Sequence, residues 1–141
     1  MDVEYKKTIP FPPSRILSQY FDLEHIAHVH PRSFGEARLV TTHANSVVWE
    51  HLTPRFLGLR LRNRIAQEYV PPDLILTRVI RGPFRGVEVV TRLEGDASGT
   101  LVDETYRIPL PNWSWLESIV RRWLVRRADR IWEEEDRKSV V

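Results

Sequence analysis

The strongest constraint on the fold is a change in hydrophobic periodicity at Pro109 and Pro111. From Glu36 up to these prolines, apolar and polar residues alternate in short runs, which is typical of antiparallel strands. After them, from Asn112, a good N-cap, to about Lys138, apolar residues recur at helical spacing. We therefore expect a sheet that packs against one long C-terminal helix. The core-facing stripe of that helix is predicted to be Leu116, Ile119, Val120, Trp123, Leu124, Ala128, Ile131 and Trp132.

Turn residues divide the earlier part of the chain into a regular series of elements. A first strand is followed by prolines and a helix that begins at Pro13 or Ser14. A second short helix is predicted over Leu23–His28. Turns are expected at His43–Ser46 and Glu94–Gly99. The predicted strands are Val3–Ile9, Ala37–Thr42, Val47–Thr53, Leu57–Val70, Leu74–Ile80, Val87–Leu93 and Leu101–Ile108.

Length and composition limit the class of protein. The 141 residues fit a single domain, 1–141, that is large enough for its own core. The chain has no cysteine, so disulfides, thiolate zinc sites and Rieske clusters are excluded within it. It has no apolar run long enough for a membrane span and no apolar leader at its start, and we expect a cytoplasmic protein. Arginines are mixed with acids rather than clustered, which does not favour nucleic-acid binding.

The order of these elements resembles the helix-grip architecture of the START-like (SRPBCC) superfamily, which includes lipid-transfer domains and polyketide cyclases. The resemblance implies an α+β domain with a curved antiparallel sheet of about seven strands wrapped round the long C-terminal helix. It also implies two short helices after the first strand and an internal cavity for an apolar or aromatic small molecule. A pattern of elements alone does not define a function.

A sharper resemblance concerns a histidine-rich segment. The run Gln19-Tyr20-Phe21-Asp22-Leu23-Glu24-His25-Ile26-Ala27-His28-Val29-His30-Pro31 is similar to the iron-binding motif of Rieske non-heme iron oxygenases, closest to the vanillate- and dicamba-type O-demethylases. His25 and His30 match its two ligand histidines. Asp22 matches the acid before them, whose role would be to orient a histidine. Gln19 stands where that family usually has asparagine, and His28 where it usually has an aromatic or apolar residue.

The resembled family takes its third iron ligand, an aspartate, from the long C-terminal helix. The segment from Glu134 to Val141 resembles that region and nominates Asp136. Helical rotation by about 100° per residue instead places Glu134 and Glu135 nearer the apolar stripe. With His25, His30 and Asp136, the chain would hold Fe(II) or another divalent metal in a facial triad with open positions. Oxidative chemistry would then need electrons from a separate ferredoxin or reductase, because this chain has no Rieske cluster.

Other residues support a metal-free alternative. His51 lies on the strand face shared with Val47 and Trp49. It is either a hydrogen-bonding group for a substrate or an interior histidine with its own partners. The rival hypothesis is a START-like carrier or polyketide cyclase/dehydratase in which His51, His28 or arginines act as acids, bases or donors. A noncatalytic subunit of a larger complex is a third possibility. The leading hypothesis is oxygenase-like modification of an apolar or aromatic ligand.

Overall fold

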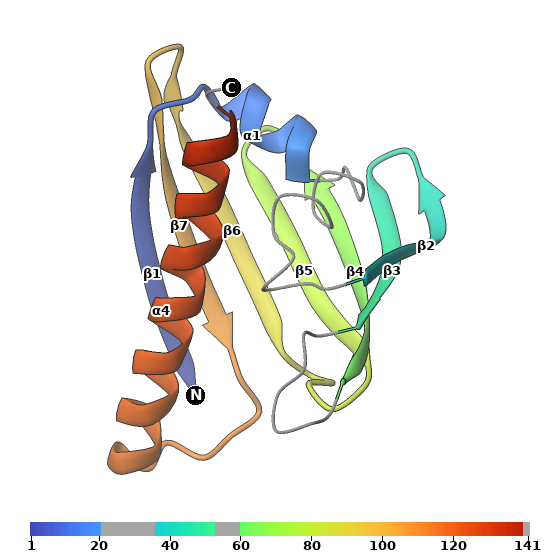
Figure 1. Ribbon diagram of the computed structural model, residues 1–141, viewed down its shortest axis with the longest axis vertical. Helices are drawn as coiled ribbons and strands as arrows, with labels where there is room; N and C mark the ends of the chain where they lie inside the picture. Colours follow the sequence, from blue (N-terminus) through green and yellow to red (C-terminus); the bar gives the residue numbers. More distant parts are fainter. Residues whose placement is uncertain (21–35, 53–59, 140–141) are drawn as a thin grey trace.

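The computed structural model describes the backbone of residues 1–20, 36–52 and 60–139, and the side chains of these ranges without 19–20, 36 and 134–139. The described strands form one seven-stranded antiparallel sheet in the order β1-β7-β6-β5-β4-β3-β2. The elements are β1 (Asp2–Ile9), α1 (Pro13–Tyr20), β2 (Glu36–His43), β3 (Ser46–Leu52), β4 (Arg62–Val70), β5 (Leu74–Arg81), β6 (Glu88–Asp96), β7 (Gly99–Arg107) and α4 (Ser114–Ser139). The predicted helix-grip fold is confirmed: a curved sheet holds a long C-terminal helix (Figure 1).

Helix α4 lies along the side of the sheet formed by β1, β7 and β6, and α1 crosses the sheet near the far end of α4 (Figure 1). The buried face of α4 presents Leu124, Ala128 and Trp132, spaced four residues apart, as an apolar stripe on one side of a helix. This stripe packs into the main core together with Val3, Tyr5, Ile9, Phe11, Ile16, Ile75, Leu93, Val102 and Tyr106. A second, smaller core of Val47, Trp49 and Ile65 lies on β3 and β4.

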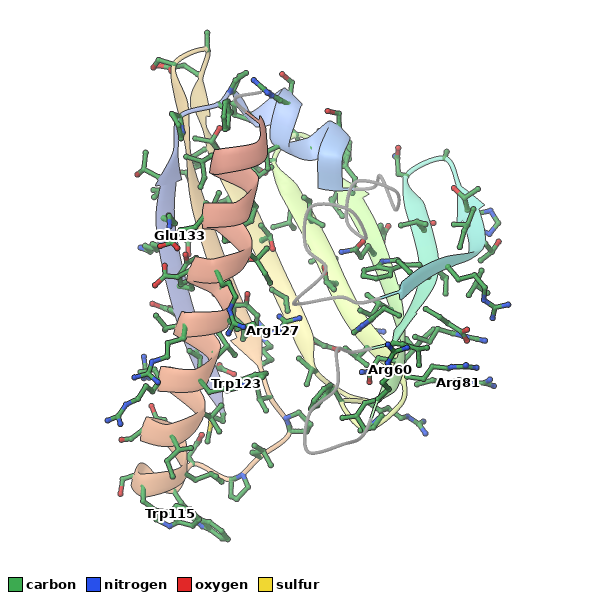
Figure 2. The ribbon with its side chains drawn as sticks, viewed as in Figure 1. Arg60, Arg81, Trp115, Trp123, Arg127 and Glu133 are labelled. Atoms are coloured by element: carbon green, nitrogen blue, oxygen red, sulfur yellow. The ribbon has the colours of Figure 1, made fainter. Side chains whose placement is uncertain are left out.

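Polar contacts fix the edge of α4 against β1. The Tyr5 hydroxyl donates a hydrogen bond of 2.7 Å to Oδ1 of Asp129. Lys7 Nζ lies 3.9 Å from Asp129 Oδ1 and 3.8 Å from Glu133 Oε1. Glu133 accordingly points to the β1 side of the helix, away from the middle of the sheet (Figure 2). Among the described residues, no helix is long and apolar enough to cross a bilayer.

Among the described residues, the strand predictions hold to within one residue except at two boundaries. Strand β4 begins at Arg62, so the prediction of a strand through Arg60 and Leu61 was wrong. Arg62 pairs with Leu52, the last described residue of β3. The second boundary concerns the turn predicted over Glu94–Gly99, which is shorter, because β6 and β7 pair as far as Asp96 and Gly99. The helix predicted over Leu23–His28 lies outside the described residues.

The start of α4 also differs from its prediction. The Trp113 carbonyl accepts the first helical hydrogen bond, 2.8 Å from Glu117 N, so Trp113 and not Asn112 occupies the N-cap position. Ile119 and Trp123 were predicted to face the core, yet they are 59% and 54% exposed. The reason is the direction of these side chains: at about 100° per residue they lie roughly 180° and 140° around the helix from Ala128, the middle of the buried stripe.

Candidate functional site

The face of the sheet that packs against α4, here called the inner face, carries an unusual number of polar side chains. Strand alternation and register place them in cross-strand pairs: His51 opposite Asn63, Gln67 opposite Thr77, and Thr91 opposite Glu104. All of these except Thr77 are buried. Because buried polar groups are costly unless they are hydrogen-bonded, their partners indicate which of them are structural and which can serve a ligand.

Glu104 on β7 is the centre of the first polar cluster. Its Oε1 accepts hydrogen bonds from the Tyr106 hydroxyl and from Nε1 of Trp132 on α4, both at 3.1 Å. Its Oε2 accepts a hydrogen bond of 3.1 Å from Thr91 Oγ1 on β6. A single carboxyl group that is 3% exposed thus ties two strands to the long helix.

Burial raises the pKa of the Glu104 carboxyl above its ordinary value, because removal from water penalises the charged form. The hydrogen bonds from Trp132, Thr91 and Tyr106 and the positive charge of Arg127 act in the opposite direction and are the smaller effects. Glu104 is therefore a buried acid that can hold a proton at a pH where an exposed glutamate has lost it.

The second polar cluster lies on β3, β4 and β5. Trp49 Nε1 donates a hydrogen bond of 2.9 Å to Oε1 of Gln67. Nε2 of Gln67 in turn donates to the Thr77 hydroxyl at 3.5 Å. This chain of contacts holds the large Trp49 side chain in one orientation, and the ring of His51 lies beside it with 5.4 Å between the ring centroids. Trp49 thus forms a fixed wall next to His51.

Asn63, opposite His51, differs from the other inner-face residues. It is 1% exposed, and its Oδ1 accepts a hydrogen bond of 3.3 Å from the backbone N of Phe84 in the β5–β6 connection. A Cβ at Gly82 would collide with the Arg62 carbonyl and with Asn63 Oδ1, so glycine at position 82 permits this close approach. The Nδ2 amide of Asn63 has no hydrogen-bond partner within the described part of the chain. It is a buried donor available to an acceptor.

Apolar side chains separate the two clusters. Ile75 is fully buried and Ile65 nearly so, while Val79 and Val89 are partly buried beside them on the inner face. From α4, Trp123 and Arg127 project to the side that faces these middle strands, opposite to Glu133 (Figure 2). The inner face therefore combines an apolar middle with polar groups on either side, and this pattern suits a molecule that is mainly apolar but carries oxygen atoms.

The residues predicted as a site are only partly described. His51 lies where the sequence placed it, buried on β3 on the same face as Val47 and Trp49, and its role toward a substrate stays a prediction. Asp22, His25, His28 and His30 lie outside the described residues, as do the side chains of Glu134, Glu135 and Asp136.

The predicted metal site consequently stays a prediction. In the described ranges, no group of three or more metal-ligating side chains could hold an ion. The ligands proposed from sequence do not belong to those ranges.

The sequence reasoning missed Glu104, Asn63 and Gln67, although a signal was present. In β7, alternation puts Glu104 on the same face as Val102 and Tyr106, and both neighbours are core residues. A carboxylate in the middle of a buried strand face is rare unless it has partners. The same test singles out Asn63 and Gln67 on either side of Ile65 in β4.

Comparison with known proteins supports the fold and no closer relationship. No family model matches the chain, and no curated protein matches it. Among solved structures, the protein TTHA0849 from Thermus thermophilus superposes with a TM-score of 0.79 at 17% identity, covering 99% of this chain and 97% of that one. The Zhui aromatase/cyclase from Streptomyces sp. R1128 gives 0.73 at 16% identity, over 97% and 94%.

A START superfamily protein from Mycobacterium smegmatis is similar to the same degree, with a TM-score of 0.72 at 13% identity over 97% of this chain and 95% of that one. These likenesses extend over nearly the whole of each chain. At such low identity they establish the fold class alone: this protein has the START-like helix-grip fold.

Proposed function

We propose that this protein binds an extended, largely apolar small molecule that carries oxygen atoms, on the inner face of its sheet. The observation that carries the proposal is the Nδ2 donor of Asn63, buried beside His51 without a partner among the described residues. A buried donor left unpaired costs about 1–3 kcal/mol, which a ligand oxygen would recover on binding. The START-like fold, shared with an aromatase/cyclase and a START superfamily protein, supports the same class of ligand.

A matched pair of probes tests the proposal. Anthraquinone carries two carbonyl oxygens on a three-ring skeleton, and anthracene has the same rings without them. Binding is followed by quenching of tryptophan fluorescence, since Trp49 lies beside His51. We expect anthraquinone to bind more tightly than anthracene, and Asn63→Leu to reduce that preference by about tenfold because the donor is removed. The control is Asn112→Leu, at an exposed position. Equal affinity for the two probes in the wild type would refute the proposal.

A second candidate function is cyclisation of a poly-oxygenated chain, and it is favoured by the Glu104 cluster. Glu104 has a raised pKa and accepts a hydrogen bond from the Tyr106 hydroxyl. An intramolecular aldol condensation forms one carbon–carbon bond and releases water, and it needs an acid and a base but no oxidant. His51 would supply the base, and Glu104 would act as a positioning residue through Tyr106.

Turnover distinguishes a cyclase from a carrier. A synthetic poly-β-ketone ester is incubated with the protein, and the aromatic product is measured by its absorbance. If the protein is a cyclase, the variants His51→Gln and Tyr106→Phe should each lose most of the turnover. Both variants should still bind anthraquinone. A carrier gives the uncatalysed product distribution in every variant.

A further inference from the structure

The outward face of α4 carries a row of exposed residues that the proposed function does not use. Trp115, Ile119, Arg122, Arg126 and Arg130 follow a spacing of four, three, four and four residues and fall within about 80° of one another around the helix. This row lies on the side of the helix opposite to the buried stripe of Leu124, Ala128 and Trp132. Trp115 and Ile119 are 61% and 59% exposed.

The apolar end of this row is the part of α4 that extends past the sheet (Figure 1). Trp115 lies at that tip (Figure 2). Its ring stacks on Trp113 with 5.9 Å between centroids and 25° between planes, which makes one broad aromatic surface. Leu110, in the connection before the helix, is also exposed. Large exposed apolar side chains gathered at one tip of a molecule usually mark a contact surface.

The rest of the row is cationic. In the described part of the chain, no carboxylate lies within ion-pair distance of Arg122, Arg126 or Arg130. The nearby carboxylates form ion pairs with other residues. Glu117 Oε1 lies 2.7 Å from Nη2 of Arg121, and Glu133 Oε1 lies 3.8 Å from Nζ of Lys7. The surface therefore pairs a tryptophan-rich tip with three arginines whose charges are available to an anionic partner.

We propose that this face of α4 docks on an anionic phospholipid surface, with Trp113, Trp115 and Ile119 entering the interface and Arg122, Arg126 and Arg130 contacting phosphates. Tryptophan favours the boundary between headgroups and acyl chains, and helices that lie in this boundary combine such side chains with arginines. Self-association through the same face is disfavoured, because two copies would bring their arginine rows together. The inference is independent of the ligand-binding proposal.

Cosedimentation with vesicles tests the docking. The full chain is mixed with vesicles of phosphatidylcholine alone or of an equimolar mixture with phosphatidylglycerol. We expect binding to the mixed vesicles only, with a blue shift of tryptophan emission and with weakening by added salt. Arg122→Gln/Arg126→Gln should reduce the partition coefficient by about 25-fold, at about fivefold for each arginine. The control Arg78→Gln/Arg92→Gln removes the same charge from exposed strand positions and should leave binding within about twofold of wild type.

A second pair of variants tests the apolar tip. Trp115→Ser/Ile119→Ser should abolish both the blue shift and most of the binding, whereas Leu76→Ser/Leu101→Ser, at exposed sheet positions, should not. Three results would overturn the proposal: absence of binding to anionic vesicles, equal loss in the control pairs, or tighter binding to a single-stranded oligonucleotide than to the vesicles. A dimer in light scattering that Trp115→Ser/Ile119→Ser dissociates would also overturn it, in favour of a second copy as the partner.

Discussion

Trp132 on α4 donates its indole N–H to Oε1 of Glu104 on β7 over 3.1 Å, a buried hydrogen bond between side chains that joins the long helix to the sheet. The buried stripe of α4 otherwise packs in the core through apolar contacts, and apolar packing tolerates sliding better than a directional bond does. The Trp132–Glu104 contact therefore sets the position of α4 along the sheet as well as adding to its stability.

Truncation of Glu104 should be strongly destabilising. Glu104→Ala leaves three buried donors, on Thr91, Tyr106 and Trp132, without their acceptor. We expect a loss of roughly 3 kcal/mol in the free energy of unfolding, measured by urea denaturation. Glu94→Ala, at an exposed position of β6, is the control and should change it by less than about 0.5 kcal/mol. A small effect at position 104 would mean that the donors find other partners.

The raised pKa of Glu104 predicts the sign of a pH effect. The folded-state pKa lies above the ordinary value of 4.5, so the stability that this group contributes is fully present below pH 4.5 and is lost as pH rises through the folded pKa. Glu104→Gln cannot ionise and lacks this loss. The free energy of unfolding of Glu104→Gln minus that of the wild type should therefore increase as the pH rises from 4.5 through the folded-state pKa of Glu104. A difference that does not change with pH would contradict the burial effect.

The sequence was sufficient for the fold because two signals are local. Alternation identifies each strand, and the prolines at 109 and 111 separate the sheet from the helix. The errors arose where tertiary geometry decides. Ile119 and Trp123 are apolar residues of the predicted stripe, but they lie roughly 180° and 140° around the helix from Ala128, and which side of α4 packs on the sheet depends on how the helix is rotated. Strand β4 likewise starts at Arg62, which pairs with Leu52 of β3, and composition alone does not locate that pair.

The inner-face polar groups required the register as well as the pattern. Alternation shows that Glu104 and Thr91 point to the same side as apolar neighbours, yet only the pairing of β6 with β7 brings them together. The partner Trp132 comes from a helix far along the chain, and its contact depends on how α4 is rotated. A sequence can indicate which single residues could belong to such a site. Only the packing of the strands and the helix brings these residues together.

The predicted metal site is tested by elemental analysis of the purified protein. If His25, His30 and Asp136 hold a divalent ion, the wild type should retain about one equivalent after dialysis, and His25→Ala and Asp136→Ala should each retain almost none. His43→Ala, in the β2–β3 turn region, is the matched histidine control. Glu135→Ala decides between the carboxylates, because metal loss there and not in Asp136→Ala would favour the helical-rotation argument. Metal content equal in all the variants would exclude the triad.

The bond between Tyr5 and Asp129 should stabilise the packing of α4 on β1. Burial, more than the bond to Asp129, raises the pKa of the Tyr5 hydroxyl, so it remains a proton donor through the ordinary pH range. Tyr5→Phe should lower the free energy of unfolding by about 1 kcal/mol, measured by chemical denaturation. Tyr69→Phe removes an exposed hydrogen bond to the Pro72 carbonyl and is the control, with a smaller loss expected. Equal losses would mean that the helix contact adds nothing.

Glu50 on β3 should control stability at acidic pH. Hydrogen bonds from Arg38 and then Arg64, each with a contact of 2.6 Å, lower the pKa of its carboxyl from 4.5 to about 2. A lowered folded-state pKa contributes stability that is present above pH 4.5 and is lost as pH falls through about 2. The Tm of the wild type should therefore fall more steeply than that of Glu50→Gln between these values, and the two curves should converge at the acid end. Glu68→Gln, on the neighbouring strand β4, should follow the wild-type curve. Parallel curves for wild type and Glu50→Gln would show that, in solution, Arg38 and Arg64 do not stabilise the charged form of the Glu50 carboxyl group.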